Sequence, residues 1–315
     1  MALSMDGKKI DVQRLIEEKK QARKWRAQTE KLIPVILFLI ASISVFTTIG
    51  IIYILLKETV QFFKEVPFLD FFTGTVLKPL SSEPSFGVLP LLMGTLTSTF
   101  IAMLVALPTG IMSAIYLSEY AGEKTRKVIK PILEVLAGIP TIVYGFFALT
   151  FVTPVLQKII PDLSFFNALS PGIVVGIMIT PMIASLSEDA MNAVPNSIRE
   201  GALALGSTRF EVAVKVVLPA ALSGIVASFV LAISRAIGET MIVTIAGGST
   251  PTLTLDVTQS IQTMTAYIVQ VSLGDATYGS TIYYSIYAVG MTLFIFTLIM
   301  NLIAQYISRK FREAY

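Results

Sequence analysis

One basic and one acidic residue interrupt the apolar stretch 219–247 of this sequence: Arg235 and Glu239, the latter followed directly by Thr240. If the stretch is a membrane helix that starts at Pro219, Arg235 lies about 24 Å along it, beyond mid-membrane. A central Arg costs roughly 2.5 to 3.5 kcal/mol on insertion scales, so such residues usually face the protein interior and mark a pathway. The spacing of four places Arg235 and Glu239 on one face of a continuous helix.

Two interpretations of this pair remain open from the residues alone. The first is a self-neutralising pair that only holds helices together, although apolar packing could replace it at little cost. The second is an anion site, because a guanidinium is planar, always charged and suited to tetrahedral oxyanions. A neighbouring carboxylate repels an anion unless that anion carries a proton to donate, as phosphate does near neutral pH and sulfate does not. We therefore predict Arg235, Glu239 and Thr240 as substrate-binding residues for a protonated oxyanion.

A second pattern lies between two apolar stretches, at positions 200–219. It reads Glu200, Gly201, Ala202, three residues, Gly206, nine residues, then Val216, one residue, Leu218 and Pro219. The pattern predicts an amphipathic segment, a turn and a helix started by Pro219, since proline is tolerated in a first helical turn. Such a segment either projects from the membrane or is an ordinary loop helix that rests its apolar face on the bilayer.

Several classes of chemistry are excluded by composition. The 315 residues contain no His and no Cys, which removes imidazole and thiolate metal ligands, Ser-His triads and disulfides. We therefore predict neither a metal site nor a cofactor in this chain. No Gly-x-x-x-x-Gly-Lys-Ser/Thr loop is present to hold nucleotide phosphates, and Glu119, Glu134, Glu188 and Asp189 form no paired motif for an intramembrane enzyme. We interpret Glu119, Glu188 and Asp189 as solvated helix ends or as contacts with neighbouring loops.

The elements that must position these residues are membrane helices. Hydrophobic residues make up 54% of the chain and charged residues 14%. Their continuity excludes a membrane barrel, which would show short alternating segments. The predicted fold class is an all-α polytopic membrane protein with six transmembrane helices, drawn from apolar stretches at 32–56, 88–118, 131–157, 170–187, 219–247 and 281–307.

The distribution of basic residues predicts the orientation. Of the 24 basic residues, nineteen lie in the N-terminal segment, in the loops after the second and fourth stretches and in the tail, whereas four lie on the alternate side. The positive-inside rule then places both termini in the cytoplasm. The net charge of +3 indicates a lipid bilayer rather than a nucleic-acid partner, because the basic residues flank apolar runs. We expect a cytoplasmic segment at 1–31, a first span at 32–56, an external loop at 57–87, a core at 88–307 and a cytoplasmic tail at 308–315.

The 200–219 pattern resembles the signature of ABC importer permeases: Glu-Ala-Ala, three residues, Gly, nine residues, Ile, one residue, Leu-Pro. The spacing is identical, and Gly201 and Val216 are the two departures. In that family the segment is a coupling helix that docks on the ATPase subunit. The resemblance implies that Glu200, Gly201, Ala202, Gly206, Leu218 and Pro219 take part in ATPase coupling, within a cytoplasmic loop at 196–219.

Three further segments are similar to the permeases of phosphate-specific ABC importers, over residues 86–307. They are residues 117–121, residues 138–145 and residues 235–240, and the entry Phe86 to Leu91 is similar to the PstC type. The resemblance implies a MetI-like core in a bacterial or archaeal cytoplasmic membrane and a heterodimer with a PstA-type permease. It also implies two PstB-type ATPase subunits, which carry the ATP and Mg, and an external PstS-type phosphate-binding protein.

The function that we predict is a permease subunit of an ATP-driven phosphate importer that forms half of the translocation pathway. The alternatives are an ABC permease for another oxyanion and a secondary anion transporter or channel that uses no ATP. The second alternative explains the composition and Arg235 equally well, but it does not explain the 200–219 signature.

Overall fold

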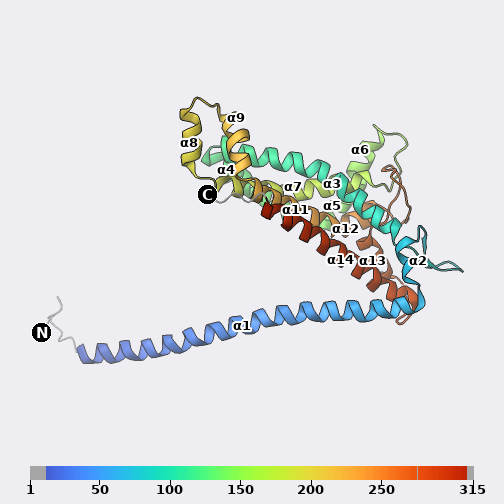
Figure 1. Ribbon diagram of the computed structural model, residues 1–315, viewed down its shortest axis with the longest axis horizontal. Helices are drawn as coiled ribbons and strands as arrows, with labels where there is room; N and C mark the ends of the chain where they lie inside the picture. Colours follow the sequence, from blue (N-terminus) through green and yellow to red (C-terminus); the bar gives the residue numbers. More distant parts are fainter. Residues whose placement is uncertain (1–11, 275, 311–315) are drawn as a thin grey trace. The chain divides into compact units, whose positions relative to one another are not determined.

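The computed structural model describes residues 12–274 and 276–310, so residues 1–11 of the predicted N-terminal segment and 311–315 of the predicted tail lie outside the described part. This part of the chain is almost entirely helical (Figure 1). The helices are α1 (Val12–Glu65), α2 (Phe68–Thr73), α3 (Leu89–Ile115), α4 (Glu123–Ala137), α5 (Thr141–Phe147), α6 (Thr153–Gln157), α7 (Leu169–Asn192), α8 (Asn196–Ala204), α9 (Arg209–Val212), α10 (Leu218–Ala220), α11 (Leu222–Ile237), α12 (Met241–Ala246), α13 (Met264–Leu273) and α14 (Thr281–Lys310). Three π-helical turns, η1 (Tyr116–Tyr120), η2 (Ala148–Val152) and η3 (Ala213–Val217), and two short strands, β1 (Leu77–Lys78) and β2 (Ser85–Phe86), complete the described elements.

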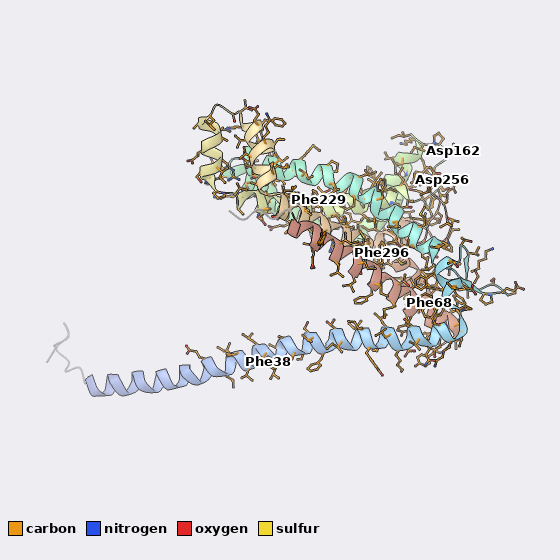
Figure 2. All side chains as sticks on the ribbon, in the orientation of Figure 1. Phe38, Phe68, Asp162, Phe229, Asp256 and Phe296 are labelled. Carbon is orange, nitrogen blue, oxygen red and sulfur yellow. The ribbon has the colours of Figure 1, made fainter. Side chains whose placement is uncertain are left out.

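The chain divides into two compact units, the first ending at Lys57 and the second beginning at Glu58. Between residues 32 and 56 the first unit is a single helix whose large apolar side chains are mostly exposed, such as Phe38 at 70% (Figure 2). The hydroxyl of Ser42 donates to the carbonyl of Phe38, so this polar group is satisfied within the helix. A long apolar helix with its backbone and hydroxyl groups satisfied internally is suited to hydrocarbon surroundings.

The second unit is built around the packing of α3 against α7. Small residues allow this close approach: a Cβ added at Gly176 would come within 2.7 Å of the Ala102 carbonyl oxygen, and one at Gly172 within 2.7 Å of the Ile101 side chain. Small residues have this role at many membrane helix interfaces. Helix α11 packs on both α3 and α7, and α14 packs on α11.

Two of the six predicted stretches are not single straight helices. Helix α4 meets the helical run 141–157 at 88°, and the helical run 209–220 meets α11 at 72°. Pro140 explains the first break, because proline disfavours a helical conformation in the residue before it. The other four stretches contain unbroken helices that are long and apolar enough to span, so the described part has four such helices, or six if each bent pair counts as one span.

The two ends of the second unit differ in structure (Figure 1). Helices α4, α8 and α9 lie at one end of α3 and α7, whereas α2, α6 and the β1–β2 hairpin lie at the other. At the hairpin end, the loops that carry Asp162 and Asp256 lie together (Figure 2), joined by a hydrogen bond from the Ser164 amide to the Thr258 carbonyl, 3.0 Å. The helical core therefore carries a separate set of loops at each end.

Candidate functional site

The predicted anion-binding residues lie at a helix break. Helix α11 ends at Ile237 and α12 begins at Met241, so Arg235 occupies the last turn of α11 and Glu239 lies between the two helices. The prediction that Arg235 and Glu239 share one face of a continuous helix is therefore wrong. Gly238 follows Ile237 as the C-cap, and its amide donates to the Ser234 carbonyl at 3.2 Å.

Glu239 is held inside the protein at this break. Its side chain is buried with the residue 7% exposed, and its Oε1 accepts a hydrogen bond from the Ile242 amide at 3.3 Å. An acceptor at this place satisfies one of the free N–H groups in the first turn of α12, where a negative charge is favourable. The Thr265 hydroxyl donates to the Glu239 backbone carbonyl at 2.7 Å, which ties the break to the start of α13. The carboxylate is thus fixed in position while its Oε2 accepts no hydrogen bond from the described residues.

The Arg235 side chain is exposed. Within the described residues its guanidinium makes neither an ion pair nor a side-chain hydrogen bond, and this includes the carboxylate of Glu239. Thr240 lies next to the break, with its hydroxyl donating to the Gly238 carbonyl at 3.1 Å. The structure thus brings Glu239 and Thr240 together at the break and leaves the Arg235 guanidinium open to an external group.

The predicted coupling loop contains the expected short helix and turn. Helix α8 ends at Ala204, and Gly206, just beyond its C-cap, has a φ of +89°, a conformation that costs residues with a Cβ roughly 1–2 kcal/mol. The Gly206 amide donates to Leu203 at 3.0 Å and the Ser207 amide donates to Ala202 at 3.2 Å. These two bonds satisfy the last carbonyls of α8 in a Schellman motif, which explains why a glycine is required at this position.

The second helix of the loop begins earlier than predicted. The helical run starts at Arg209, not at Pro219, because Thr208 and Glu211 form a reciprocal capping box. Hydrogen bonds from the Thr208 backbone, from Lys215 and from the Thr208 hydroxyl lower the pKa of Glu211 from 4.5 to about 2. Because the pKa is lowered on folding, the stability that the ionised Glu211 contributes is fully present above about pH 4.5 and is lost as the pH falls toward 2. Pro219 instead lies two residues before the 72° bend.

The remaining predicted coupling residues divide between an exposed and a packed face. Glu200, Gly201 and Pro219 are exposed, whereas Ala202 and Leu218 pack beside a buried cluster that includes Met191 and Val217. Leu205, which follows the last residue of α8, is 89% exposed. The loop therefore presents an open surface that the described residues do not cover, and the length of α11 separates it from Arg235.

Sequence reasoning missed an ionic network at the same end of the unit. Glu188 of α7 is completely buried, and it forms ion pairs with Arg126 and, at 3.1 Å, with Lys130, both from α4. Lys130 also pairs with Asp189 at 3.0 Å. The interpretation of Glu188 as a solvated end is therefore wrong, although contacts with a neighbouring segment were expected. The i, i+4 spacing of Arg126 and Lys130 was the available signal, because it places two cations on one helix face.

A second ion pair joins α8 to the end of α3. Arg199 contacts Glu119 of η1 at 3.2 Å, with side chains 15% and 9% exposed. Eighty positions separate these residues in the sequence, so no local spacing could have paired them.

Comparisons with known proteins assign the class of the chain. Residues 106–313 match the family described as "Binding-protein-dependent transport system inner membrane component", and this match contains both the 200–219 loop and Arg235. The chain belongs to this family, and it is therefore an ABC transporter permease, an integral membrane subunit whose ATPase is a separate polypeptide.

Several relatives support this assignment and the resemblance found from the sequence. The chain is 35% identical over 242 residues to the "Probable ABC transporter permease protein YqgH" of Bacillus subtilis, covering 77% of this chain and 78% of the relative. It is 32% identical to the "Probable phosphate transport system permease protein PstC" of Methanocaldococcus jannaschii, covering 78% and 83%. It is 33% identical to the "Phosphate transport system permease protein PstC" of Mesorhizobium japonicum, covering 75% and 77%. The resemblance to PstC-type permeases is confirmed.

Solved structures confirm the MetI-like permease fold. A bacterial ABC transporter that imports the acidic polysaccharide alginate gives a TM-score of 0.60 at 19% identity, over 95% of this chain and 100% of that chain. The MetNI methionine ABC transporter in an inward-facing conformation gives 0.53 at 19% identity, over 72% and 95%.

Proposed function

We propose that this chain is the PstC-type permease subunit of an ATP-driven importer of inorganic phosphate. In this proposal it pairs with a PstA-type permease to form the translocation pathway. Two PstB-type ATPase subunits supply the energy through their own ATP and Mg, and an external PstS-type protein delivers phosphate. Similarity over about three quarters of the chain to permeases named for phosphate transport supports the proposed substrate.

The observation that carries the proposal is the exposed guanidinium of Arg235, which has no ion pair within the described residues, together with the buried carboxylate of Glu239 at the break that directly follows α11. An arginine at this depth without a partner among the described residues calls for an anion or a carboxylate from outside. Glu239 is buried and anchored through Oε1, which leaves Oε2 to accept a hydrogen bond from a protonated oxygen of the ligand. Phosphate carries such a proton near neutral pH, whereas sulfate carries none and would be repelled by the Glu239 carboxylate. Thr240 adds a hydroxyl at the same break.

The exposed surface of α8 is the proposed contact with the ATPase subunit. Glu200 and Leu205 face away from the chain, and an 89% exposed leucine at a helix end needs apolar cover from a partner. Helix α8 leads through η3 and α10 to the start of α11, which carries Arg235 at its other end. In this proposal, movement of α8 on ATP binding reaches the proposed anion site at the far end of α11.

The proposed arrangement in the cytoplasmic or inner membrane has six spans and both termini in the cytoplasm. The two broken pairs each contribute one span, mainly α5 to α6 and α11 to α12. Residues 141–157 would be about 26 Å long as a helix, close to the ~30 Å hydrocarbon core. Labelling of single introduced cysteines tests this orientation, because the native chain has no cysteine. Cysteines at Ser82 and Ser249 should react with an impermeant reagent from outside, while one at Ser207 should not; external labelling at Ser207 would reverse the orientation.

Phosphate uptake by the reconstituted importer tests the proposed site. Arg235→Ala should abolish uptake while assembly with the ATPase persists, because the change also removes an insertion cost of a few kcal/mol. Arg235→Lys should restore little, since a point charge does not reproduce the planar fork. Normal phosphate uptake by Arg235→Ala would refute the site. Uptake of sulfate in preference to phosphate by the wild type would favour the alternative of another oxyanion, and uptake without ATP would favour the secondary transporter.

A further inference from the structure

Arg199 is tied into the protein more completely than its neighbours on α8. Its Nε and Nη2 both donate to Glu119 Oε1 at 3.2 Å, and Nη2 also donates to the Met191 carbonyl at 2.6 Å. Its Nη1 donates to the Val194 carbonyl at 2.5 Å and to Asn196 Oδ1 at 3.1 Å. One guanidinium therefore joins three elements: α8, the π turn that ends α3, and the end of α7.

The contacts of Arg199 continue into the buried ionic cluster. The Ser118 hydroxyl lies 3.0 Å from Glu119 Oε1 and 3.3 Å from Asn192 Oδ1. The Asn192 side-chain amide donates to Glu188 Oε1 at 3.2 Å, and Glu188 pairs with the two cations of α4. A series of polar contacts thus runs from α8 to α4, through the Ser118 hydroxyl, which donates to one of its two acceptors at a time.

This arrangement gives α8 a direct connection to the spans that does not pass through the Gly206 turn. The alternative covalent route from α8 to α11 passes Gly206 and the 72° bend, either of which can absorb movement. A charge-assisted network with several bonds from one planar fork is stiffer, because no single rotation releases it.

We propose that Arg199 is a positioning residue that makes α8, the end of α3 and the end of α7 move as one body. Its side chain transmits the movement of the ATPase contact to the helices around the pathway. This inference rests on the proposed ATPase contact of α8, and it adds a role for residues that do not touch the ATPase subunit, the nucleotide or the anion. Glu119 is the acceptor that completes the connection.

The ratio of phosphate imported to ATP hydrolysed tests the inference, measured with the importer assembled from all its subunits and supplied with the phosphate-loaded external binding protein. Arg199→Ala and Glu119→Gln should each keep the ATPase subunits bound but reduce the phosphate imported per ATP about 5-fold or more, the lower range of typical coupling between sites. Arg199→Lys should restore part of this ratio. The double variant should be no worse than Arg199→Ala alone, since both changes break one contact.

The matched control is Arg209→Ala, which removes an exposed arginine of the same loop whose side chain makes no hydrogen bond or ion pair within the described residues. It should leave the ratio unchanged. If Arg199→Ala fails to assemble, Glu119→Gln still tests the connection, because it leaves the carbonyl contacts of Arg199 in place. A wild-type ratio of phosphate imported per ATP in Glu119→Gln would overturn the inference. A ratio that falls in the variants only as far as the amount of bound ATPase subunit falls would also overturn it.

A separate variant distinguishes failure of the underlying ATPase contact. Leu205→Ser changes only the exposed surface of α8 and should weaken copurification of the ATPase subunits. Undiminished copurification would contradict the proposed ATPase contact, whereas the result with Glu119→Gln decides the role of Arg199.

Discussion

Arg199 and Arg235 lie at opposite ends of the α8-to-α11 region and have opposite surroundings. Arg199 is largely buried and makes bonds to a carboxylate, an amide and two backbone carbonyls. Arg235 is exposed and makes no ion pair within the part of the chain that the structure describes. The guanidinium of Arg199 has partners within the protein, whereas that of Arg235 has none among the described residues.

The difference separates what folding satisfies from what a ligand or partner must satisfy. A guanidinium that its own chain surrounds with acceptors fixes the local structure, and removing it leaves buried acceptors unpaired. A guanidinium that lies open in an apolar stretch keeps its full capacity to bind an anion. We therefore assign the first arginine to mechanical connection and the second to recognition.

The largest effect is expected at Gly206, where the comparison depends on an intact α8. Gly206→Val should remove most coupled transport, because a β-branched residue strains the left-handed conformation at φ +89° and breaks the end of α8. The measurement is phosphate imported per ATP by the assembled importer. Gly201→Ala is the matched control, since an added Cβ there meets nothing within 4 Å and the backbone needs no positive φ. Equal results for the two variants would contradict the role assigned to the turn.

A change in anion selectivity is expected at Glu239, and it tests the proposed anion site around Arg235. Glu239→Gln keeps an oxygen acceptor for the Ile242 amide, so the start of α12 should persist. The lost charge should reduce discrimination of phosphate against sulfate more than it reduces anion entry. Competition of sulfate with phosphate uptake measures this ratio. Unchanged selectivity would remove Glu239 from the site and leave it as a helix cap.

A smaller effect, on stability, is expected in the ionic cluster of Glu188, Arg126 and Lys130. Glu188→Ala leaves Arg126 and Lys130 without their buried acceptor and should destabilise the protein by about 1–3 kcal/mol, less than a fully buried pair because both cations are partly exposed. The matched control is Asp189→Ala, which removes the adjacent carboxylate with 59% exposure and one partner. Thermal unfolding of the purified assembly should show a lower midpoint for Glu188→Ala than for Asp189→Ala. The reverse order would contradict the structural role assigned to the buried carboxylate.

The loop signature predicted local structure because its residues act through their own backbone. Gly206 is needed wherever a helix ends in a left-handed conformation, and such a requirement is visible in one residue. The apolar stretches predicted the helical class for the same reason, since length and composition decide whether a segment can span.

Tertiary arrangements were not accessible from the sequence. The pairing of Arg199 with Glu119 depends on how α3 ends beside α8, and the burial of Glu188 depends on α4 lying against α7. The shared face of Arg235 and Glu239 was inferred from a periodicity that holds only while the helix continues, and the helix ends at Ile237. A glycine such as Gly238 permits that end but does not require it, because its φ of −84° is open to other residues.

The structure of the assembled importer with bound phosphate tests the central claim most directly. The account predicts phosphate oxygens within hydrogen-bond distance of the Arg235 guanidinium, with a protonated oxygen directed at Glu239. An Arg235 side chain paired with a carboxylate of another subunit, with phosphate bound elsewhere, would contradict it.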